Sequence, residues 1–334
     1  MSLLIVIPCL NEEAHLPGLL ATLAAETAEH KARIVVVDGG STDRSAEIVR
    51  AFAETEPRVA LLHNPKRIQS AAVNMAVKLH AAESDVFIRV DAHAHYPEGF
   101  IASLIAAHAE TKADSVTVAM RACAQNGACF QSAAAAAQNS VLGNGGSSHR
   151  KGGERKWVDH GHHALFSTRA FLAVDGYDES FTHNEDAELD TRIRANGGKI
   201  LLAADILIDY FPRRTARALM RQYFMFGRGR AKTMLKHRAP LKPRQLVPIV
   251  IAPMAAAALL APFAPWIAAP FAAYLTLCLA YGATLGQSCA RLAGAPAILT
   301  HIAWSAGFWT QLALSAGPAH KRAHNPLTSE QESV

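Results

Sequence analysis

Short apolar runs that stop at proline, polar or acidic residues recur through the first third of the chain. They cover residues 3–8, 33–38, 59–63 and 86–91, and a segment with helical character follows each of them. Apolar runs of this length are typical of strands that are buried on both faces of a parallel sheet. The alternation therefore predicts an α/β fold, with a mainly parallel sheet and helices on both of its faces.

The same pattern continues, less regularly, beyond residue 97. It predicts a helix from Pro97, a strand near 115–120, another strand over 163–167 and a helix over 186–195. An alanine-rich segment at 132–142 and a loop at 143–156, rich in glycine, serine and basic residues, interrupt the alternation. That loop is either a linker or a lid, and the chemical residues on both sides of it favour the lid.

Charge divides the chain into two unequal parts. Residues 1–210 carry 19 basic and 26 acidic residues, a net charge of −7, whereas residues 211–334 carry 14 basic and 2 acidic residues, a net charge of +12. A basic part that is almost free of acids and rich in Ala, Leu and Pro favours a membrane surface as partner over nucleic acid.

Three stretches of the second part are apolar enough to enter a bilayer: 246–261, 263–285 and 297–316. The middle one is long enough to span it, and Pro248 and Pro253 make the first a candidate for a re-entrant or interfacial piece. The alternative is a set of buried helices in a soluble bundle. The chain is thus expected to comprise a first domain over 1–212, a basic amphipathic segment over 213–244, a hydrophobic region over 245–318 and a polar tail over 319–334.

Within the amphipathic segment, residues 215–238 are predicted to form a helix that lies along the membrane, with an apolar face in the acyl boundary. The alternative is a helix packed on the first domain. Arg230 projects from the apolar side, and a guanidinium there needs an anionic partner. Arg230, with Arg228, is therefore predicted to hold a diphosphate. No signal peptide is expected, and five cysteines without paired metal spacing are expected to be reduced thiols.

Two of the predicted strands end in acids, Asp38 and Asp91, which are expected to lie side by side at the carboxyl edge of the sheet. Asp91 and His93 could hold one metal ion through an oxygen and a nitrogen, and the imidazole favours Mn²⁺ over Mg²⁺. The alternative is an Asp that caps a turn, followed by a surface His. No GxGxxG motif follows the first strand and no GxxxxGK[ST] motif occurs, which argues against an NAD enzyme or a P-loop hydrolase.

A third polar stretch, 183–190, contains four acids and opens a predicted helix. Acids in a first helical turn interact favourably with the helix dipole, so simple capping would explain them. Alternatively, one acid points into the site as a general base. A carboxylate held against other carboxylates has its pKa raised, which suits that role.

Taken in order, these motifs resemble those of inverting family-2 glycosyltransferases with a GT-A fold. The resemblance covers about residues 3–230 and is carried by Ile7–Glu12, Val36–Asp43, Asp91–His93, Gly161–Phe166, Gly176–Glu179 and Glu185–Asp186. The chain is most similar to membrane-bound exopolysaccharide glucosyltransferases of the succinoglycan type, which share the Asp-Ala-His form, the His-Asn-Glu-Asp run and a Gly-Arg-Gly-Arg stretch.

The resemblance implies a role for each part of the site. A nucleotide sugar would be bound by Pro8, Asn11, Glu12, Asp38 and Asp91, and a divalent cation, Mn²⁺ or Mg²⁺, by Asp91 and His93. Asp186 would be the catalytic base, with Glu185 next in line. The acceptor or its diphosphate would be bound by Gly161, His162, Gln222, Arg228 and Arg230.

The implied donor is UDP-glucose, and the implied acceptor is a lipid-diphosphate-linked sugar. Transfer would take place on the cytoplasmic face of a bacterial-type inner membrane, with other polysaccharide-pathway enzymes as potential partners. The Gln-x-x-Arg-Trp signature of processive synthases is matched only by Gln222, which disfavours a processive polysaccharide synthase. A second alternative is a non-catalytic, membrane-tethered nucleotide-sugar-binding protein.

Overall fold

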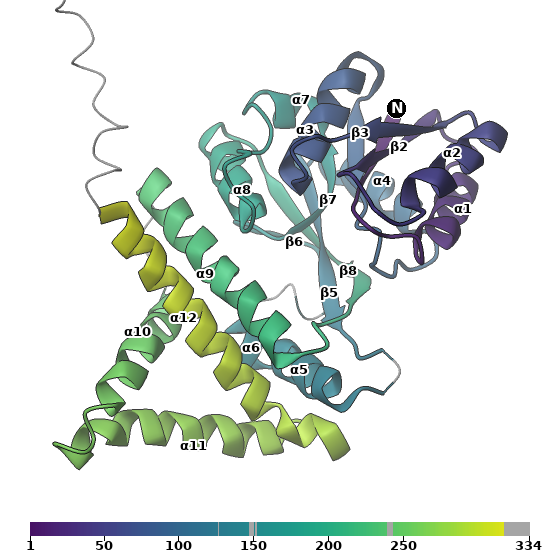
Figure 1. Cartoon of the computed structure of the whole chain (residues 1–334). Coiled ribbons are helices and arrows are strands. Elements are labelled where there is room, and N and C mark those ends of the chain that lie inside the picture. The colour runs from purple at the N-terminus through teal and green to yellow at the C-terminus, as the bar shows by residue number, and fades with distance from the viewer. Residues whose placement is uncertain (126, 147–149, 151, 239–242, 317–334) are drawn as a thin grey trace, which may run out of the picture. The chain divides into compact units, whose positions relative to one another are not determined.

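The computed structural model describes residues 1–125, 127–146, 150, 152–238 and 243–316 (Figure 1). The chain forms two compact units. The first comprises residues 1–125 and 146–211, and the second comprises residues 126–145 and 212–334. The longer segment of the second unit starts at residue 212, next to the expected domain boundary. Residues 126–145, which interrupt the first unit along the sequence, also belong to the second unit, and sequence patterns do not reveal this. The expected polar tail lies outside the described residues, as does part of the 143–156 loop.

The first unit is built on one eight-stranded sheet of order β3-β2-β1-β4-β7-β5-β8-β6. The strands are β1 (Leu3–Cys9), β2 (Ala32–Asp38), β3 (Val59–His63), β4 (Val86–Arg89), β5 (Ser115–Ala122), β6 (Lys156–Trp157), β7 (His162–Ser167) and β8 (Ile200–Tyr210). The first four in spatial order are parallel, β7 is antiparallel to both β4 and β5, and β6 is antiparallel to β8. Strands β5 and β8 are also parallel to each other, so the prediction of a mainly parallel sheet is confirmed, and the antiparallel pairs are those made by β7 and β6.

Helices cover both faces of this sheet, as predicted (Figure 1). One face packs on α1 (Leu16–Glu26), α2 (Ser45–Thr55) and α4 (Phe100–Thr111), and the other on α3 (Gln69–His80), α7 (Thr168–Leu172) and α8 (Glu185–Ala195). The short helix η1 (Ala81–Glu83) follows α3. Each face buries its own cluster of apolar side chains, so the strands between them are apolar on both sides.

Side chains along β4 alternate between the two faces of the sheet, and this alternation determines the direction in which Arg89 points. Ile88 and Val90 enter the core under α1 and α4, whereas Phe87 enters the opposite core, where its ring lies 4.9 Å from those of Phe166 and Phe171. Side chains two residues apart share a face of the sheet. Arg89 therefore projects to the same side as Phe87, toward α8.

The second unit is helical. It contains α5 (Cys129–Asn139), α6 (Val141–Asn144), α9 (Ala216–His237), α10 (Pro243–Ala258), η3 (Pro265–Ala268), α11 (Ala269–Ala283), η4 (Ser288–Leu292) and α12 (Gly294–Ala316). The helix expected over 215–238 is present as α9. Its apolar face, however, packs on α12: Ala231 contacts Phe308, and Gly227 lies against the backbone of Trp304. The prediction that this face enters the acyl boundary is therefore wrong, because α12 covers it.

Two further expectations about this unit need correction. The alanine-rich segment that interrupts the alternation, for which no element was predicted, forms α5 and α6, because its alanines pack in a small core with Ala293 and Ala297. The expectation of reduced thiols is wrong for one pair, since a disulfide joins Cys129 to Cys289. These cysteines are separated by 160 residues, so their spacing in the sequence gives no signal. Cys9, Cys123 and Cys278 are free.

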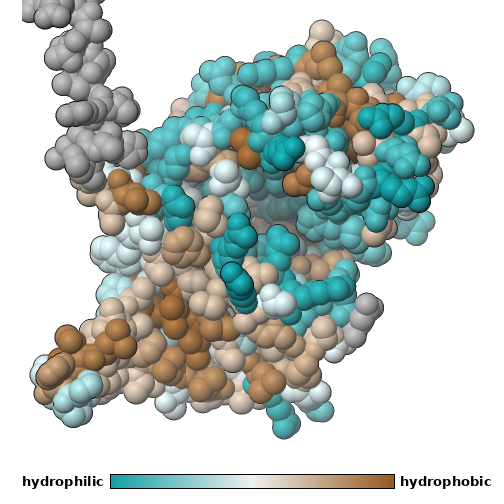
Figure 2. All heavy atoms as spheres, viewed as in Figure 1, coloured by the Kyte–Doolittle hydropathy of each residue, from teal (hydrophilic) through white to brown (hydrophobic). Residues whose placement is uncertain are grey.

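Among the described helices, one stretch, Pro265–Ala283, is long and apolar enough to cross a membrane. Large apolar side chains are exposed on α10 and α11 and on the turn between them, including Val247, Leu259, Phe263, Trp266 and Leu277. Figure 2 shows this concentration of apolar residues over the second unit. A surface of this kind marks an interaction with a membrane or another protein.

Candidate active site

Arg89 lies at the centre of the site, at the end of β4, with a side chain that is 2% exposed. Its Nη1 donates hydrogen bonds to Asp186 Oδ1 at 2.7 Å and to Tyr177 Oη at 2.8 Å, and its Nη2 donates to Asp186 Oδ2 at 3.3 Å. This is a fork-like pairing of guanidinium and carboxylate. It ties Asp186, in the first turn of α8, to the end of a strand 97 residues earlier.

Tyr177 completes the support of Asp186 by donating its hydroxyl proton to Oδ1 at 2.8 Å. Burial raises the pKa of Tyr177 well above its usual value, so the hydroxyl stays a donor. The backbone N–H of Tyr177 donates to Asn74 Oδ1, and Asn74 Nδ2 donates to the Tyr177 carbonyl, each at 2.8 Å. Gly176, at φ +66°, allows this approach, because a Cβ there would lie 2.5 Å from Asn74 Oδ1.

Asp91 lies on the other side of the same guanidinium. Its Oδ1 accepts a hydrogen bond from Gln69 Nε2 at 3.1 Å and is 3.8 Å from Arg89 Nε. Its Oδ2 is 3.7 Å from His162 Nε2. Two residues expected in different parts of the site, Asp91 and His162, are therefore brought together. Arg89 thus lies between the expected metal ligand and the expected catalytic acids.

His93 is oriented by Glu12, whose Oε1 is 2.8 Å from His93 Nδ1. The Glu12 backbone is in turn fixed by Ser45 Oγ at 2.8 Å. A histidine that ligates a metal commonly has its other ring nitrogen paired with a carboxylate. The pair Asp91 and His93 fits a divalent cation in this respect. No group of three or more His, Cys, Asp and Glu gathers as a metal site in the described part of the chain.

The loop after β1 connects two parts of the site. Asp38 and Asp91 are at the same edge, but β1 lies between β2 and β4, so the expectation that they are side by side is wrong. Asn11, at φ +59°, accepts a hydrogen bond from Thr42 N–H at 2.8 Å, on the β2 side, while its neighbour Glu12 contacts His93 on the β4 side. The chain from Pro8 to Glu12 therefore bridges the gap.

Asp38 is buried, and its carboxylate accepts hydrogen bonds from the backbone of Gly40 and from the backbone and hydroxyl of Ser41. These are the bonds of a carboxylate that fixes its own turn. The predicted contact of Asp38 with a nucleotide base remains a prediction.

The four acids of the 183–190 stretch have different environments. Glu188 is fully buried and paired with Arg192, and Asp190 is fully buried and accepts from Gly161 N–H at 3.3 Å, so both carboxylates are held by contacts within the fold. Gly161 is close-packed on Thr117, whose Oγ1 would be 2.5 Å from a Cβ. Glu185 differs: burial, and then the charge of Asp186, raise its pKa to about 7, although Arg89 partly counteracts them.

The family model for glycosyl transferase family 2 matches residues 4–173. The chain belongs to this family. It is 50% identical over 316 residues to the succinoglycan biosynthesis protein ExoA of Rhizobium meliloti, an alignment that covers 93% of this chain and 95% of the relative. It is 41% identical to an undecaprenyl-phosphate 4-deoxy-4-formamido-L-arabinose transferase of Pseudomonas fluorescens, over 30% of this chain and 31% of that protein.

A solved structure shares the fold of this family-2 glycosyltransferase. It is the mannosyltransferase PcManGT of Pyrobaculum calidifontis, in complex with GDP-Man and Mn²⁺, with a TM-score of 0.54 and 20% identity. The superposition covers 96% of this chain and 82% of that one. The GT-A fold expected from the motifs is thereby confirmed.

Three residues of the glycosyltransferase that were expected to bind the acceptor, Gln222, Arg228 and Arg230, belong to α9 in the second unit. Arg228 donates from Nε and Nη2 to Gln311 Oε1 of α12, at 3.2 and 3.1 Å. That pairing gives Arg228 a structural contact, and its binding of a diphosphate remains a prediction.

The structure adds Arg89, Tyr177 and Gln69 to the site. A signal for Arg89 is present in the sequence, because a charged residue inside an apolar strand that is buried on both faces needs a partner.

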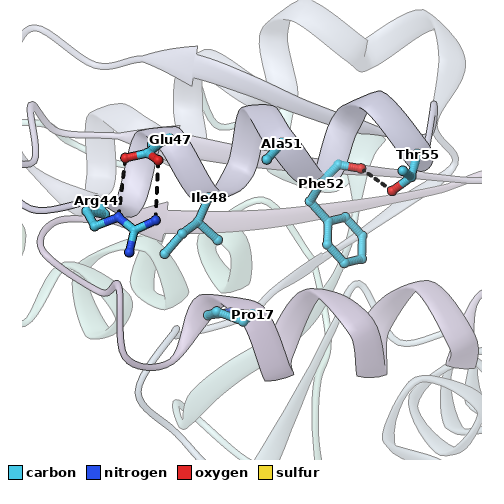
Figure 3. A pocket seen from close by; sticks show the side chains of 7 residues that line it. All are labelled: Pro17, Arg44, Glu47, Ile48, Ala51, Phe52 and Thr55. Atoms are coloured by element: carbon cyan, nitrogen blue, oxygen red, sulfur yellow. Dashed lines mark hydrogen bonds and ion pairs between the residues drawn. The ribbon is translucent and has the colours of Figure 1, made fainter.

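A shallow hollow lies between α1 and α2 and is lined by Pro17, Ile48 and Phe52, among others (Figure 3). None of the candidate site residues lines it.

Proposed function

We propose that this glycosyltransferase moves glucose from UDP-glucose to a lipid-diphosphate-linked saccharide during exopolysaccharide synthesis. Support comes from the relative named for succinoglycan biosynthesis, which is half identical over nearly the whole chain. The observation that carries the proposal is the grouping around Arg89, in which Asp91 and Asp186, the neighbour of Glu185, lie on either side of one cation.

Each part of the site has a role in one direct displacement with inversion. The segment Pro8–Glu12 and Asp38 hold the nucleotide, and Asp91 with His93 hold Mn²⁺ or Mg²⁺. The ion would neutralise the charge that develops on the departing diphosphate. Gly161 and His162 place the acceptor next to the donor, and the 3.7 Å between His162 Nε2 and Asp91 Oδ2 supports this arrangement. The acidic pair receives the proton of the acceptor hydroxyl as it attacks the anomeric carbon.

The second unit anchors the enzyme in an inner membrane, with the catalytic unit on the cytoplasmic side, where nucleotide sugars are available. One helical stretch is long and apolar enough to span, and the exposed apolar side chains around it suit lipid. Gln222, Arg228 and Arg230 on α9 then serve the diphosphate of a lipid acceptor. Other enzymes of the same polysaccharide pathway are the natural source of that acceptor.

The test is transfer of labelled sugar in membranes that contain the full chain. Membranes are incubated with a panel of radiolabelled UDP- and GDP-sugars, and both released nucleotide and label in the extracted lipid are measured. We expect label from UDP-glucose in the lipid, one sugar per acceptor, and none with Asp91→Ala. Label in long polymers would indicate a processive synthase, and binding of UDP-glucose without release of UDP would indicate a non-catalytic protein.

A further inference from the structure

The backbone of Asp91 lies just beyond the end of β4 and therefore outside the hydrogen-bond ladder of the sheet. The pairing of β4 with β1 ends where Arg89 lies opposite Val6, and one more hydrogen bond follows, from Val90 N–H to the Val6 carbonyl at 2.9 Å. The peptide groups of Asp91 need other partners, because a backbone group that is shielded from water and unpaired costs free energy. Whatever supplies these partners also determines the direction in which the Asp91 side chain leaves the strand.

Tyr96, five residues further along the chain, supplies both partners with one hydroxyl group. Its Oη accepts a hydrogen bond from Asp91 N–H at 2.7 Å and donates one to the Asp91 carbonyl at 3.1 Å. A hydroxyl can both donate and accept, so one side chain satisfies the two backbone groups of one residue. The Asp91 carbonyl also accepts from Ala94 N–H at 3.2 Å. The segment 91–96 is thus closed by a turn and by the tyrosine hydroxyl.

The hydroxyl can fix this segment because Tyr96 is itself held. Its ring packs against the apolar cluster that α4 covers, with its centroid 4.6 Å from that of Phe100. Its neighbour His95 pairs with Asp209 of β8 through two backbone hydrogen bonds, at 3.1 and 3.3 Å. The loop that carries the two expected metal ligands is therefore anchored to β4, to β8 and to the core.

The backbone of Asp91 determines where both expected metal ligands point. With this backbone fixed, Asp91 Oδ1 accepts a hydrogen bond from Gln69 Nε2 at 3.1 Å. His93 follows two residues later, and its Nδ1 is 2.8 Å from Glu12 Oε1. A rotation of the Asp91 peptide would move the carboxylate and the imidazole relative to each other. Groups that orient metal ligands in this way contribute to the affinity for the ion.

We propose that Tyr96 is a positioning residue for the donor: its hydroxyl holds the Asp91 backbone so that Asp91 and His93 meet one divalent cation. This inference rests on the proposed function, in which these two residues bind the ion that accompanies the nucleotide sugar. Tyr96 acts through Asp91, and the role requires no contact between the tyrosine and the donor. The contacts proposed for Asp38 belong to β2, on the other side of β1, and do not depend on this hydroxyl.

The test is the dependence of UDP binding on Mn²⁺ in Tyr96→Phe, measured by calorimetric titration of the full chain in detergent. The substitution keeps the ring and removes only the hydroxyl. We expect the Mn²⁺ concentration that gives half-maximal UDP binding to rise about 10–100-fold, the usual effect of losing a group that orients a metal ligand. Saturating Mn²⁺ should restore the UDP affinity of the wild type, because the nucleotide contacts outside this loop are intact.

The matched control is Thr27→Val, which removes another hydroxyl from the fold. Thr27 is buried at the end of α1 and donates to the Leu23 carbonyl at 2.7 Å, and it is not part of the candidate site. This variant should unfold at a lower temperature than the wild type and keep the wild-type requirement for Mn²⁺. A loss of stability alone therefore does not reproduce the effect expected for Tyr96→Phe.

The inference is overturned if Tyr96→Phe keeps the wild-type requirement for Mn²⁺. It is also overturned if excess Mn²⁺ does not restore UDP affinity, or if the variant fails to fold, because the hydroxyl would then serve the fold alone. A different result would contradict the proposed metal site, and the inference with it: a wild-type chain that binds UDP equally well in excess chelator. A wild-type chain that binds UDP with Mn²⁺ but transfers no sugar would contradict only the proposed transfer.

Discussion

The other residues of β4 are apolar, whereas Arg89, at the end of the strand, carries a charge. A buried ion pair is weak evidence for stability, because removing two charges from water costs about as much as their attraction returns. An aliphatic pair could fill the same space between β4 and α8. The geometry points to function as the reason for the charge, since the same guanidinium lies beside Asp91 and fixes Asp186.

We therefore expect Arg89→Leu to destabilise the chain by about 3 kcal/mol, the low end for a broken buried pair, because the Asp186 side chain is 22% exposed and keeps some water. The double variant Arg89→Leu/Asp186→Leu should recover most of this loss in stability and none of the activity. Thermal unfolding of the single and double variants measures the loss of stability and its recovery. Equal stability of wild type and Arg89→Leu would contradict the pairing.

His93 gives a second prediction about a single side chain. Binding of UDP to the full chain should require a divalent cation, and Mn²⁺ should be better than Mg²⁺, because an imidazole ligand suits Mn²⁺. His93→Asp should move the preference toward Mg²⁺, which prefers oxygen ligands. Calorimetric titration of the full chain and of the His93→Asp variant with UDP, in the presence of each ion in turn, tests these preferences. Unchanged UDP affinity in excess chelator would remove the metal from this site.

The secondary structure shows what local pattern could and could not predict. Strands β1 to β4 follow from apolar runs, because a strand buried on both faces needs apolar residues throughout. The insertion of β7, antiparallel, between β4 and β5 could not be predicted, because partner choice depends on the whole sheet. The same limit applies within the site. Arg89 meets Tyr177 and Asp186 across 88 and 97 residues, and Cys129 meets Cys289 across 160.

Helix α10 shows how the second unit tolerates proline in an apolar helix. Pro253 has no N–H for the carbonyl of Ile249, four residues earlier. That carbonyl instead accepts hydrogen bonds from Ser305 Oγ and Trp309 Nε1 of α12, each at 2.8 Å. Neighbouring helices supply such donors where water is absent, as in a membrane. Helix α12 thus serves as the central support of α10 and α9.

Close packing of α9 on α12 gives a prediction about these helices. A Cβ on Gly227 would lie 1.9 Å from the Trp304 carbonyl oxygen, and one on Gly307 would lie 1.9 Å from that of Phe224. Gly227→Ala should therefore destabilise the chain by about 1–3 kcal/mol, although alanine normally stabilises a helix by about 1 kcal/mol. Thermal unfolding in detergent measures the change.

The matched control is Gly18→Ala in α1, where a Cβ would meet nothing within 4 Å. This variant should be as stable as the wild type or more so, because only the gain in helix propensity applies. Two alanine variants with the same unfolding temperature would show that α9 and α12 do not approach each other this closely.

The two units differ in charge and in surface. Residues 1–210 have a net charge of −7 and the remainder +12, and no acid occurs between Asp209 and Glu330. The exposed apolar side chains concentrate on the second unit, as Figure 2 shows, whereas the first unit has few. Basic residues near a bilayer are attracted to anionic lipid, and exposed Leu, Phe and Trp side chains lose unfavourable contact with water there.

The membrane assignment can be tested with one matched pair of substitutions in the full chain. Leu277 in α11 is 70% exposed and Leu79 in α3 of the first unit is 60% exposed, so a lysine at either position disturbs little packing. A lysine in the middle of a membrane-spanning helix costs about 2.5–3.5 kcal/mol. Leu277→Lys should therefore lower the fraction of chain that floats with lipid vesicles or resists alkaline carbonate extraction, and Leu79→Lys should not. If both variants float and resist extraction as the wild type does, α11 does not lie in lipid, and its apolar surface must instead be covered by another protein or by a second copy of the chain.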